Sequence, residues 1–354
     1  MARERLALGT CALGRAIDAC GSPLDGGKAL CGRSISLDLH APAPGERAPV
    51  TTALWTGVRV VDALLTIGRG ARVGIFGAPG AGKTTLVESI VDGCAADAVV
   101  VALVGERGRE AQLWIDRRDA RTTIVCATSD RSAPERVRAA RVAVAHAAAL
   151  RERGLHVLLI LDSLARFAAA LREIGVAAGE SAGRGGYPPS VYAEMARLLE
   201  VAGALRDGSI TVVATVIDDG DARDPVSEAA RSPLDGHIAL SSRLAQAGRF
   251  PAVDVPASAS RTMDAVAPES QARAAVLVRR AIATLDRVDD ARALGIAPQG
   301  RFVRAAIAAE SRIEAFLRQG RAASQYDETF DELRRISELL EEADESVRNS
   351  VTLR

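Results

Sequence analysis

The 354-residue sequence predicts an α/β fold, in which a mostly parallel sheet precedes a smaller α-helical domain. Two observations support this prediction. From residue 71 onward, apolar β-rich runs alternate with helical or turn segments, and this alternation is typical of a parallel sheet with helices on both faces. After about residue 264 the β-rich runs stop, and amphipathic stretches rich in Ala, Arg, Glu and Leu follow.

Five apolar runs mark the expected strands, and each is followed by a segment of helical or turn character. They cover residues 71–76, 98–104, 122–127, 156–161 and 209–217. The helix after the third run has its own start signal, Ser132 followed by Pro134 and Glu135, and its apolar periodicity continues to about Leu150. The helices expected in the C-terminal part cover residues 269–285, 300–318 and 328–346.

The same patterns divide the chain into three parts. Residues 1–48 are rich in Gly, Pro and small polar residues, and the prolines at positions 42, 44 and 49 mark a linker. We therefore expect this segment to be a remnant or linker and not a complete domain. The sheet-forming domain is expected over residues 49–264 and the helical domain over residues 265–354, which suits the length of the chain.

Composition excludes several classes of protein. Forty-five basic residues balance 45 acidic ones, so no global field attracts the chain to nucleic acid, and we expect no nucleic-acid partner. No uncharged apolar run approaches the ~18 residues that span a bilayer, so we expect peripheral membrane association only. The five cysteines show no C-x-x-C spacing, which argues against a disulfide framework or a zinc site and favours the cytoplasm.

The strongest motif is a glycine-rich loop between the first expected strand and a helix. It matches G-x-x-x-x-G-K-T and consists of Gly77, Ala78, Pro79, Gly80, Ala81, Gly82, Lys83 and Thr84, followed by Thr85. The glycines let the backbone curl so that its N–H groups point at phosphate oxygens, and the helix that begins near Lys83 adds its positive end. We expect Lys83 to bind the β- and γ-phosphates of ATP, and the Thr84 hydroxyl to bind Mg²⁺.

A second candidate for this site is an acidic residue at the end of the fourth expected strand. Asp162 directly follows the apolar run Val157–Leu161, so its carboxylate lies at the carboxyl edge of the sheet, where open α/β sheets bind ligands. Together with the loop, this position predicts that Asp162 binds Mg²⁺ through a water molecule. Taken alone, an Asp in this position is more often the N-cap of the following helix.

Hydrolysis also needs a group that activates water, and a charged turn follows the second expected strand. Glu106 lies at the carboxyl end of that strand, where its carboxylate can polarise the attacking water, and the adjacent Arg107 can meet charge on the γ-phosphate. A solvated charged turn explains the same residues equally well from their spacing alone.

Longer stretches of the sequence match the patterns of a known family. They are Gly105–Glu110 (GERGRE), Leu161–Arg166 (LDSLAR), Arg172–Gly175, Gly186–Tyr192 (GYPPSVY), Arg197–Glu200, Asp224–Pro225, Leu234–Ile238 and Ala247–Asp254. In these stretches the chain resembles the hexameric ATPase family that contains the catalytic subunits of rotary ATP synthases. The GYPPSVY stretch resembles the type III secretion and flagellar export branch of that family.

The resemblance implies a RecA-like P-loop NTPase core and a Mg²⁺-dependent ATPase that forms a homohexamer in the cytoplasm, peripheral at the inner-membrane face of an export apparatus. Its implied function is ATP hydrolysis that powers type III protein export, through chaperone release, unfolding and secretion of substrate proteins. The implied partners are the stalk and stator proteins of the apparatus and chaperone–substrate complexes, which would meet the helical end. The alternatives are the catalytic subunit of a rotary ATP synthase-type complex and a silent nucleotide-binding scaffold.

Two site residues follow only from the resemblance. Phe250 matches the position where an aromatic ring stacks on adenine, and Arg261 matches an arginine finger that a neighbouring subunit supplies to the transferred phosphoryl group. Arg166 would be a supporting residue beside the site. Judged without the family, Phe250 is expected to be a core aromatic and Arg261 a surface charge.

The family normally carries an N-terminal β-barrel. This chain matches the family only from the segment that follows the barrel, at Leu13–Asp18 and Pro23–Gly26. We therefore expect residues 1–48 to be the remnant that follows a missing barrel. Because the barrel helps to hold the ring of the family together, the homohexamer of this chain is expected to be weakened.

Overall fold

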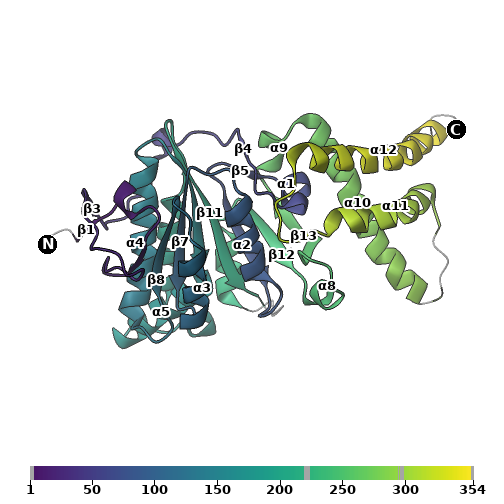
Figure 1. The fold of residues 1–354 in the computed structure, drawn as a ribbon. Coiled ribbons are helices and arrows are strands. Elements are labelled where there is room, and N and C mark those ends of the chain that lie inside the picture. The colour runs from purple at the N-terminus through teal and green to yellow at the C-terminus, as the bar shows by residue number, and fades with distance from the viewer. Residues whose placement is uncertain (1–3, 219–223, 294, 296–298, 352–354) are drawn as a thin grey trace. The chain divides into compact units, whose positions relative to one another are not determined.

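The computed structural model describes residues 4–218, 224–293, 295 and 299–351 of the chain. The chain divides into two compact units, each made of three separate segments, and Figure 1 shows their elements. The first unit consists of residues 1–51, 68–79 and 96–237, and the second of residues 52–67, 80–95 and 238–354.

The first unit is built on a mostly parallel sheet, as the sequence predicts. Its strands lie in the order β6, β11, β9, β7, β8 and β2, and each neighbouring pair is parallel. In that order the strands cover Arg72–Gly77, Ser209–Ile217, His156–Asp162, Ala98–Val104, Thr122–Ala127 and Ala16–Asp18. The short β10 (Gly203–Ala204) pairs with β11 in the antiparallel direction. The five predicted strands are thus confirmed to within one residue at each end.

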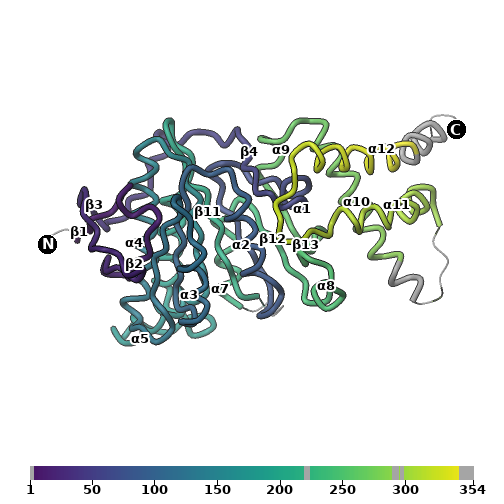
Figure 2. The backbone as a smooth tube through the Cα atoms, viewed as in Figure 1, coloured from purple at the N-terminus to yellow at the C-terminus, as the bar shows by residue number. Residues whose placement is uncertain are grey.

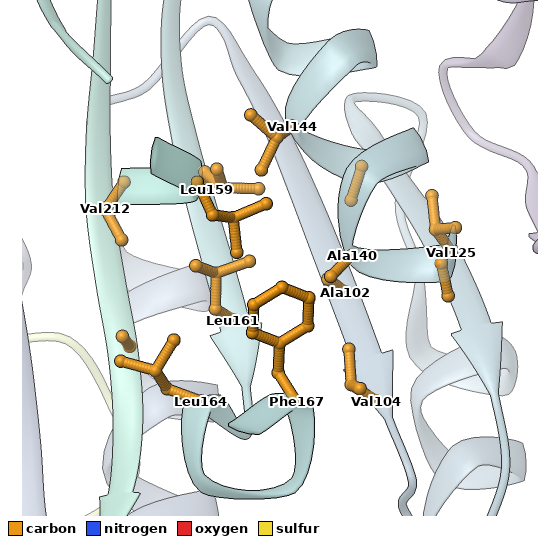
Figure 3. Packing of buried hydrophobic residues seen from close by; sticks show 14 of the residues in the cluster. Ala102, Val104, Val125, Ala140, Val144, Leu159, Leu161, Leu164, Phe167 and Val212 are labelled. Atoms are coloured by element: carbon orange, nitrogen blue, oxygen red, sulfur yellow. The ribbon is translucent and has the colours of Figure 1, made fainter. Parts of the chain in front are cut away.

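Helices cover the sheet of the first unit. They are α3 (Gly108–Arg117), α4 (Ala133–Arg151), α5 (Leu164–Ala177), α6 (Pro189–Glu200) and α7 (Pro225–Arg231), with a 3-10 helix at Arg184–Gly186. The predicted start of α4 is confirmed, because the N–H and the hydroxyl of Ser132 donate to the Glu135 carboxylate at 3.0 and 2.6 Å. Small buried alanines such as Ala140 let α4 approach strands β7, β8 and β9 closely. Figure 3 shows the Phe167 ring between Leu161 and Val104 in this core.

The N-terminal segment packs onto the first unit. Strands β1 (Arg5–Ala7) and β3 (Ser34–Ser36) form an antiparallel pair, and 3-10 helices lie at Thr10–Ala12 and Pro44–Glu46. Strand β2 extends the central sheet, since Ala16 pairs with Ile124 of β8. The sequence did not indicate this strand, which has only three residues and lies in a region rich in Gly and Pro.

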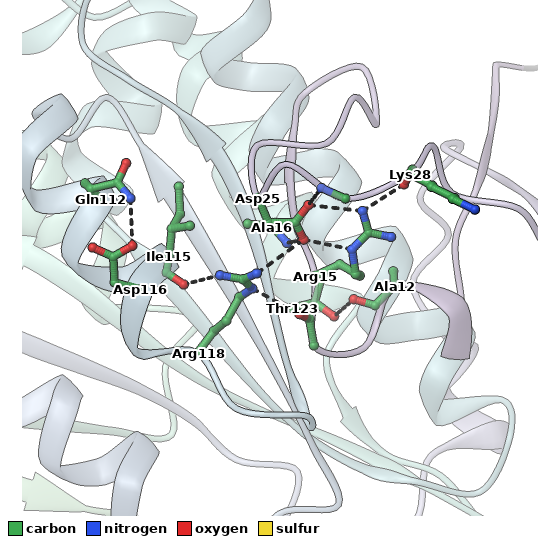
Figure 4. A network of polar contacts seen from close by, with 12 residues as sticks. Ala12, Arg15, Ala16, Asp25, Lys28, Gln112, Ile115, Asp116, Arg118 and Thr123 are labelled. Atoms are coloured by element: carbon green, nitrogen blue, oxygen red, sulfur yellow. Dashed lines mark hydrogen bonds and ion pairs between the residues drawn. The ribbon is translucent and has the colours of Figure 1, made fainter.

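Asp25 fixes the turn that follows β2 (Figure 4). Its carboxylate accepts hydrogen bonds from Arg15 at 2.7 and 3.0 Å and from the backbone N–H groups of Ala16 and Gly27, both at 3.0 Å. Arg118 lies 3.5 Å from the same carboxylate, whose side chain is 2% exposed. The Arg15 hydrogen bonds, joined by those from the two backbone groups, hold the pKa of Asp25 well below its usual range in spite of burial.

Replacing Asp25 with Ala is expected to destabilise the first unit by about 3 kcal/mol at pH 7, because Arg15 loses its buried partner. The pKa of Asp25 is lower in the folded state than in the unfolded state. The stabilisation by Asp25 is therefore complete above the ordinary Asp pKa of about 4 and is lost as the pH falls below it. Urea unfolding at pH 7 and pH 3 measures it. The control is Asp116→Ala, which removes an exposed contact with Gln112 and should cost less than ~0.5 kcal/mol. Equal losses in the two variants would contradict this role.

The second unit is mainly helical. Its elements are β4 (Ala53–Leu54), α1 (Arg59–Leu64), α2 (Lys83–Gly93), α8 (Ser242–Gln246), β13 (Val253–Ser260), α9 (Met263–Val266), α10 (Glu269–Ala293), α11 (Arg301–Leu317) and α12 (Tyr326–Val351). Strands β5 (Ile67–Gly68) and β12 (Gly236–Leu240) lie where the chain passes from one unit to the other. Helices α10, α11 and α12 pack on one another, and Figure 2 traces their paths.

The three predicted C-terminal helices are confirmed, although α10 and α12 extend further than predicted. Strands β12 and β13 were not predicted. Within the part of the chain that the structure describes, no helix combines the length and the apolar character needed to cross a membrane.

Candidate functional site

The glycine-rich loop has the backbone that phosphate binding requires. Strand β6 ends at Gly77 and α2 begins at Lys83, as the sequence predicts. Gly80 and Gly82 adopt φ angles of 82° and 96°, in the left-handed region that residues with a side chain rarely enter. A Cβ built on either glycine would meet no atom within 4 Å, so the loop borders open space at both positions. These features fit a polyphosphate held by backbone N–H groups at the start of a helix.

The other loop residues are placed as the motif requires. Lys83 and Thr84 are the first two residues of α2, and Thr84 and Thr85 are exposed. Ala78 and Pro79 follow β6 at the carboxyl edge of the sheet, while Ala81 is buried. The Thr84 hydroxyl and the Lys83 ammonium therefore start from the same helical turn, where a bound triphosphate could reach both.

Asp162 lies at the same edge of the first unit's sheet as Gly77. It is the last residue of β9, which is separated from β6 only by β11, and it is 7% exposed. The Thr215 hydroxyl of β11 donates a 2.6 Å hydrogen bond to its carboxylate and so orients it. The alternative interpretation of Asp162 as a helix N-cap is wrong, because Ser163 caps α5 by accepting the N–H of Arg166.

Glu106 lies in the same unit, two residues beyond the end of β7, and is 8% exposed. It forms an ion pair with Arg166 of α5. The pKa of Glu106 is raised to about 7, mainly by burial. The hydrogen bond with Glu110 and the charge of Asp162 act in the same direction, and Arg166 acts against them. The alternative interpretation as a solvated turn is therefore wrong for Glu106. A buried carboxyl group that titrates near neutral pH is suited to accept a proton from water.

Arg107, by contrast, is accessible to solvent. It precedes α3, its side chain is 80% exposed, and its guanidinium lies 3.9 Å from Glu110.

Together, Gly77, Asp162 and Glu106 place the start of the loop and two buried carboxyl groups along one edge of the sheet. In addition, the structure shows that Thr215 holds the Asp162 carboxylate. The sequence did not predict this role of Thr215, because threonine is common in buried strands.

A cavity of about 250 Å³ in the second unit borders the first turns of α2. We call it the Phe250 pocket; its lining residues are Val58, Gly82, Thr85, Leu86, Ser89, Phe250, Pro251, Ala252, Gln319, Gly320 and Arg321. Phe250 is 50% exposed, so its interpretation as a core aromatic is wrong. An exposed ring beside α2, the helix that follows the glycine-rich loop, offers a flat surface on which a nucleotide base can stack.

Arg261 lies outside the Phe250 pocket. It follows the last residue of β13 and is exposed. The preceding residue fixes this turn, because the Ser260 hydroxyl donates to the Thr66 carbonyl at 2.7 Å and accepts the N–H of Met263 at 3.2 Å. An exposed guanidinium on a firmly held turn is accessible to another copy of the chain.

Comparison with known proteins places this chain in a family. The model for the nucleotide-binding domain of the ATP synthase alpha/beta family matches residues 57–260. The type 3 secretion system ATPase of Xanthomonas euvesicatoria is 46% identical over 300 residues, which are 83% of this chain and 68% of that protein. The flagellum-specific ATP synthase of Salmonella typhimurium is 41% identical over 328 residues, which are 90% of this chain and 72% of that protein.

Solved structures agree with these relatives. The assembled ATPase EscN of the enteropathogenic E. coli type III secretion system is similar with a TM-score of 0.90 and 38% identity, over 94% of this chain and 83% of EscN. This likeness confirms the predicted RecA-like fold. The alternative of a rotary ATP synthase catalytic subunit finds no support, because these relatives belong to secretion systems or the flagellum. The chain is therefore a member of the type III secretion and flagellar export ATPases, within the ATP synthase alpha/beta family.

Proposed function

We propose that the chain hydrolyses Mg-ATP at the glycine-rich loop and that this hydrolysis powers type III protein export, through chaperone release, unfolding and secretion of substrate proteins. The observation that carries the proposal is the loop, in which two left-handed glycines precede Lys83 at the start of α2. In this proposal residues 49–264 form the ATPase domain. Residues 265–354, which contain α10 to α12, form a helical domain that meets chaperone–substrate complexes.

Binding of ATP is assigned to groups on the loop and in the Phe250 pocket. Backbone N–H groups of residues 77–85 and the Lys83 ammonium hold the β- and γ-phosphates, and the Phe250 ring stacks on adenine. A Mg²⁺ ion bound by the Thr84 hydroxyl, and through water by Asp162, would neutralise charge on the phosphates. The oxygen donors of Thr84 and Asp162 suit this hard cation.

Hydrolysis is assigned to the carboxyl edge of the sheet. The ionised Glu106 carboxylate accepts a proton from the water whose oxygen forms the new bond to the γ-phosphorus, and the bond from that phosphorus to the bridging oxygen of ADP breaks. Arg166 holds Glu106 in place through their ion pair. Arg107 is close in sequence and exposed, so its charge can approach the γ-phosphate.

Assembly completes the site in this proposal. Arg261 of one copy reaches the γ-phosphate bound by its neighbour, which requires a ring, and we propose a homohexamer. One related structure is the assembled ATPase EscN in complex with its central stalk EscO, which supports a stalk protein as a partner of this chain. We further propose contact with stator proteins and a cytoplasmic place at the inner-membrane face of the export apparatus.

A secretion assay tests the proposal. The gene is deleted in the bacterium that encodes the chain, and either the wild-type chain or Lys83→Ala is supplied in trans. We expect only the wild-type chain to restore type III substrates to the culture medium, because Lys83→Ala lacks the cation that binds the triphosphate. Secretion restored by Lys83→Ala, at equal protein levels, would contradict the proposal.

A further inference from the structure

The junction between α11 and α12 forms part of the Phe250 pocket. Gln319, Gly320 and Arg321 follow the end of α11 and line this cavity with Phe250. The C-terminal helices therefore contribute directly to the surface beside the first turns of α2, although they are remote from the glycine-rich loop in the sequence. The hydrogen bonds of this junction show how its position is fixed.

Gln319 ties three separate segments together. Its side-chain carbonyl accepts the backbone N–H of Arg59 at 2.7 Å, and its side-chain amide donates to the carbonyls of Gly57 and Ala322 at 2.7 and 2.8 Å. Its backbone N–H donates to the carbonyl of Phe250 at 2.8 Å. Both N–H groups of the side-chain amide are thus engaged within the protein.

Further contacts fix the same segments. The Arg318 guanidinium donates to the Gly248 carbonyl at 3.0 Å, and the buried Arg249 donates to Glu314 of α11 at 2.6 Å. The Gly57 turn fits tightly, because a Cβ at this left-handed position would lie 2.8 Å from that of Ala323. The end of α11 thus holds residues 248–250 on one side and the Gly57 turn on the other.

We propose that Gln319 is a positioning residue for the nucleotide base. Its backbone N–H holds the Phe250 segment, and its side chain holds the Gly57 turn beside the pocket residue Val58. It acts on the base through these walls of the pocket, because its own amide donors are already used. This inference rests on the proposed stacking role of Phe250. Displacement of the α11–α12 junction, for instance by a protein bound to these helices, then weakens base binding while phosphate binding at the loop is unchanged.

The test compares two ligands that differ in the base. The dissociation constants of ADP and of inorganic tripolyphosphate, each with Mg²⁺, are measured on the full chain for wild type and for Gln319→Met, which keeps the length of the side chain without its amide. We expect ADP to bind roughly tenfold more weakly to the variant, because the side-chain hydrogen bonds to Gly57, Arg59 and Ala322 are lost while the backbone bond to Phe250 stays. Tripolyphosphate should bind within about twofold of wild type. Gln325→Ala, an exposed glutamine of the same loop, is the matched control and should change neither constant.

Two results would overturn the inference. Equal weakening of ADP and tripolyphosphate would show general damage to the site, and unchanged ADP binding would show that Gln319 does not position the pocket. If Gln319→Met fails to fold, Arg318→Ala replaces it, because its half-exposed side chain makes the outer Gly248 contact and the exposed Glu314 ion pair. We expect Arg318→Ala to weaken ADP binding about two- to threefold and to leave tripolyphosphate binding unchanged. Phe250→Ala separates this inference from the proposed stacking role: if ADP binds more weakly to Phe250→Ala but unchanged to Gln319→Met, only the role of Gln319 fails, and if ADP binds unchanged to Phe250→Ala, the stacking role itself fails.

Discussion

Replacement of Arg261 by Ala is expected to lower kcat for ATP hydrolysis by about 10³-fold or more, while ATP binds within about threefold of wild type. A guanidinium that meets charge developing on the γ-phosphate acts in the transition state and contributes little to binding of the substrate. The structure places Arg261 on an exposed turn, held by Ser260, where another copy can use it. Steady-state phosphate release and ATP binding measure the two effects. Arg273→Ala, at an exposed arginine of α10, is the control and should retain wild-type kcat.

A mixture of two inactive variants tests whether Arg261 acts between copies. In a ring that contains Arg261→Ala and Lys83→Ala chains, some sites combine the intact loop of one variant with the intact Arg261 of the other. Random mixing of equal amounts should therefore recover about a quarter of the wild-type rate. A mixture as inactive as its components would show that Arg261 does not complete the site of a neighbour.

Replacement of Glu106 by Gln is expected to lower kcat by about 10²- to 10⁴-fold, because the amide keeps the shape of the side chain but cannot accept a proton from water. The dependence of the wild-type kcat on pH should also show that Glu106 acts as a base. Burial raises the pKa of Glu106 to about 7, and the base is the ionised form, so kcat should rise as the pH increases through this value. Glu173→Gln, at an exposed carboxyl group of α5, should leave kcat and its pH profile unchanged. A Glu106→Gln variant with wild-type kcat would exclude Glu106 as the base.

The central strands were predictable because they are buried on both faces. Every residue of β7 is buried, which produces the continuous apolar run that marks such a strand in the sequence. Strand β13 gave no such signal, because it contains Pro256 and several small residues and its burial varies along the strand. Strand β2 could not be predicted from the sequence either, because its partner β8 lies more than a hundred residues away along the chain. Only the pairing with β8 makes this short segment a strand.

The candidate site was predictable where its residues form local motifs. The glycine-rich loop, Asp162 and Glu106 each come directly after an apolar run or the residue that follows it, so their spacing placed them at one edge of the sheet. Phe250 and Arg261 came only from the resemblance to the family, since nothing in their local sequence marks exposure or a ligand. Gln319 was not predicted at all, because its role depends on contacts with residues about 260 positions away, such as Arg59.

The glycine-rich loop is expected to hydrolyse ATP in an assembly of copies of this chain. Phosphate release by the purified chain with Mg-ATP, measured over a wide range of protein concentrations beside Lys83→Ala, tests it most directly. We expect hydrolysis whose rate per chain rises with concentration as neighbours complete the site, and at least a 100-fold lower rate for Lys83→Ala, on the order of the loss of one charge-stabilising group. No hydrolysis at any concentration, or an equal rate for Lys83→Ala, would contradict it.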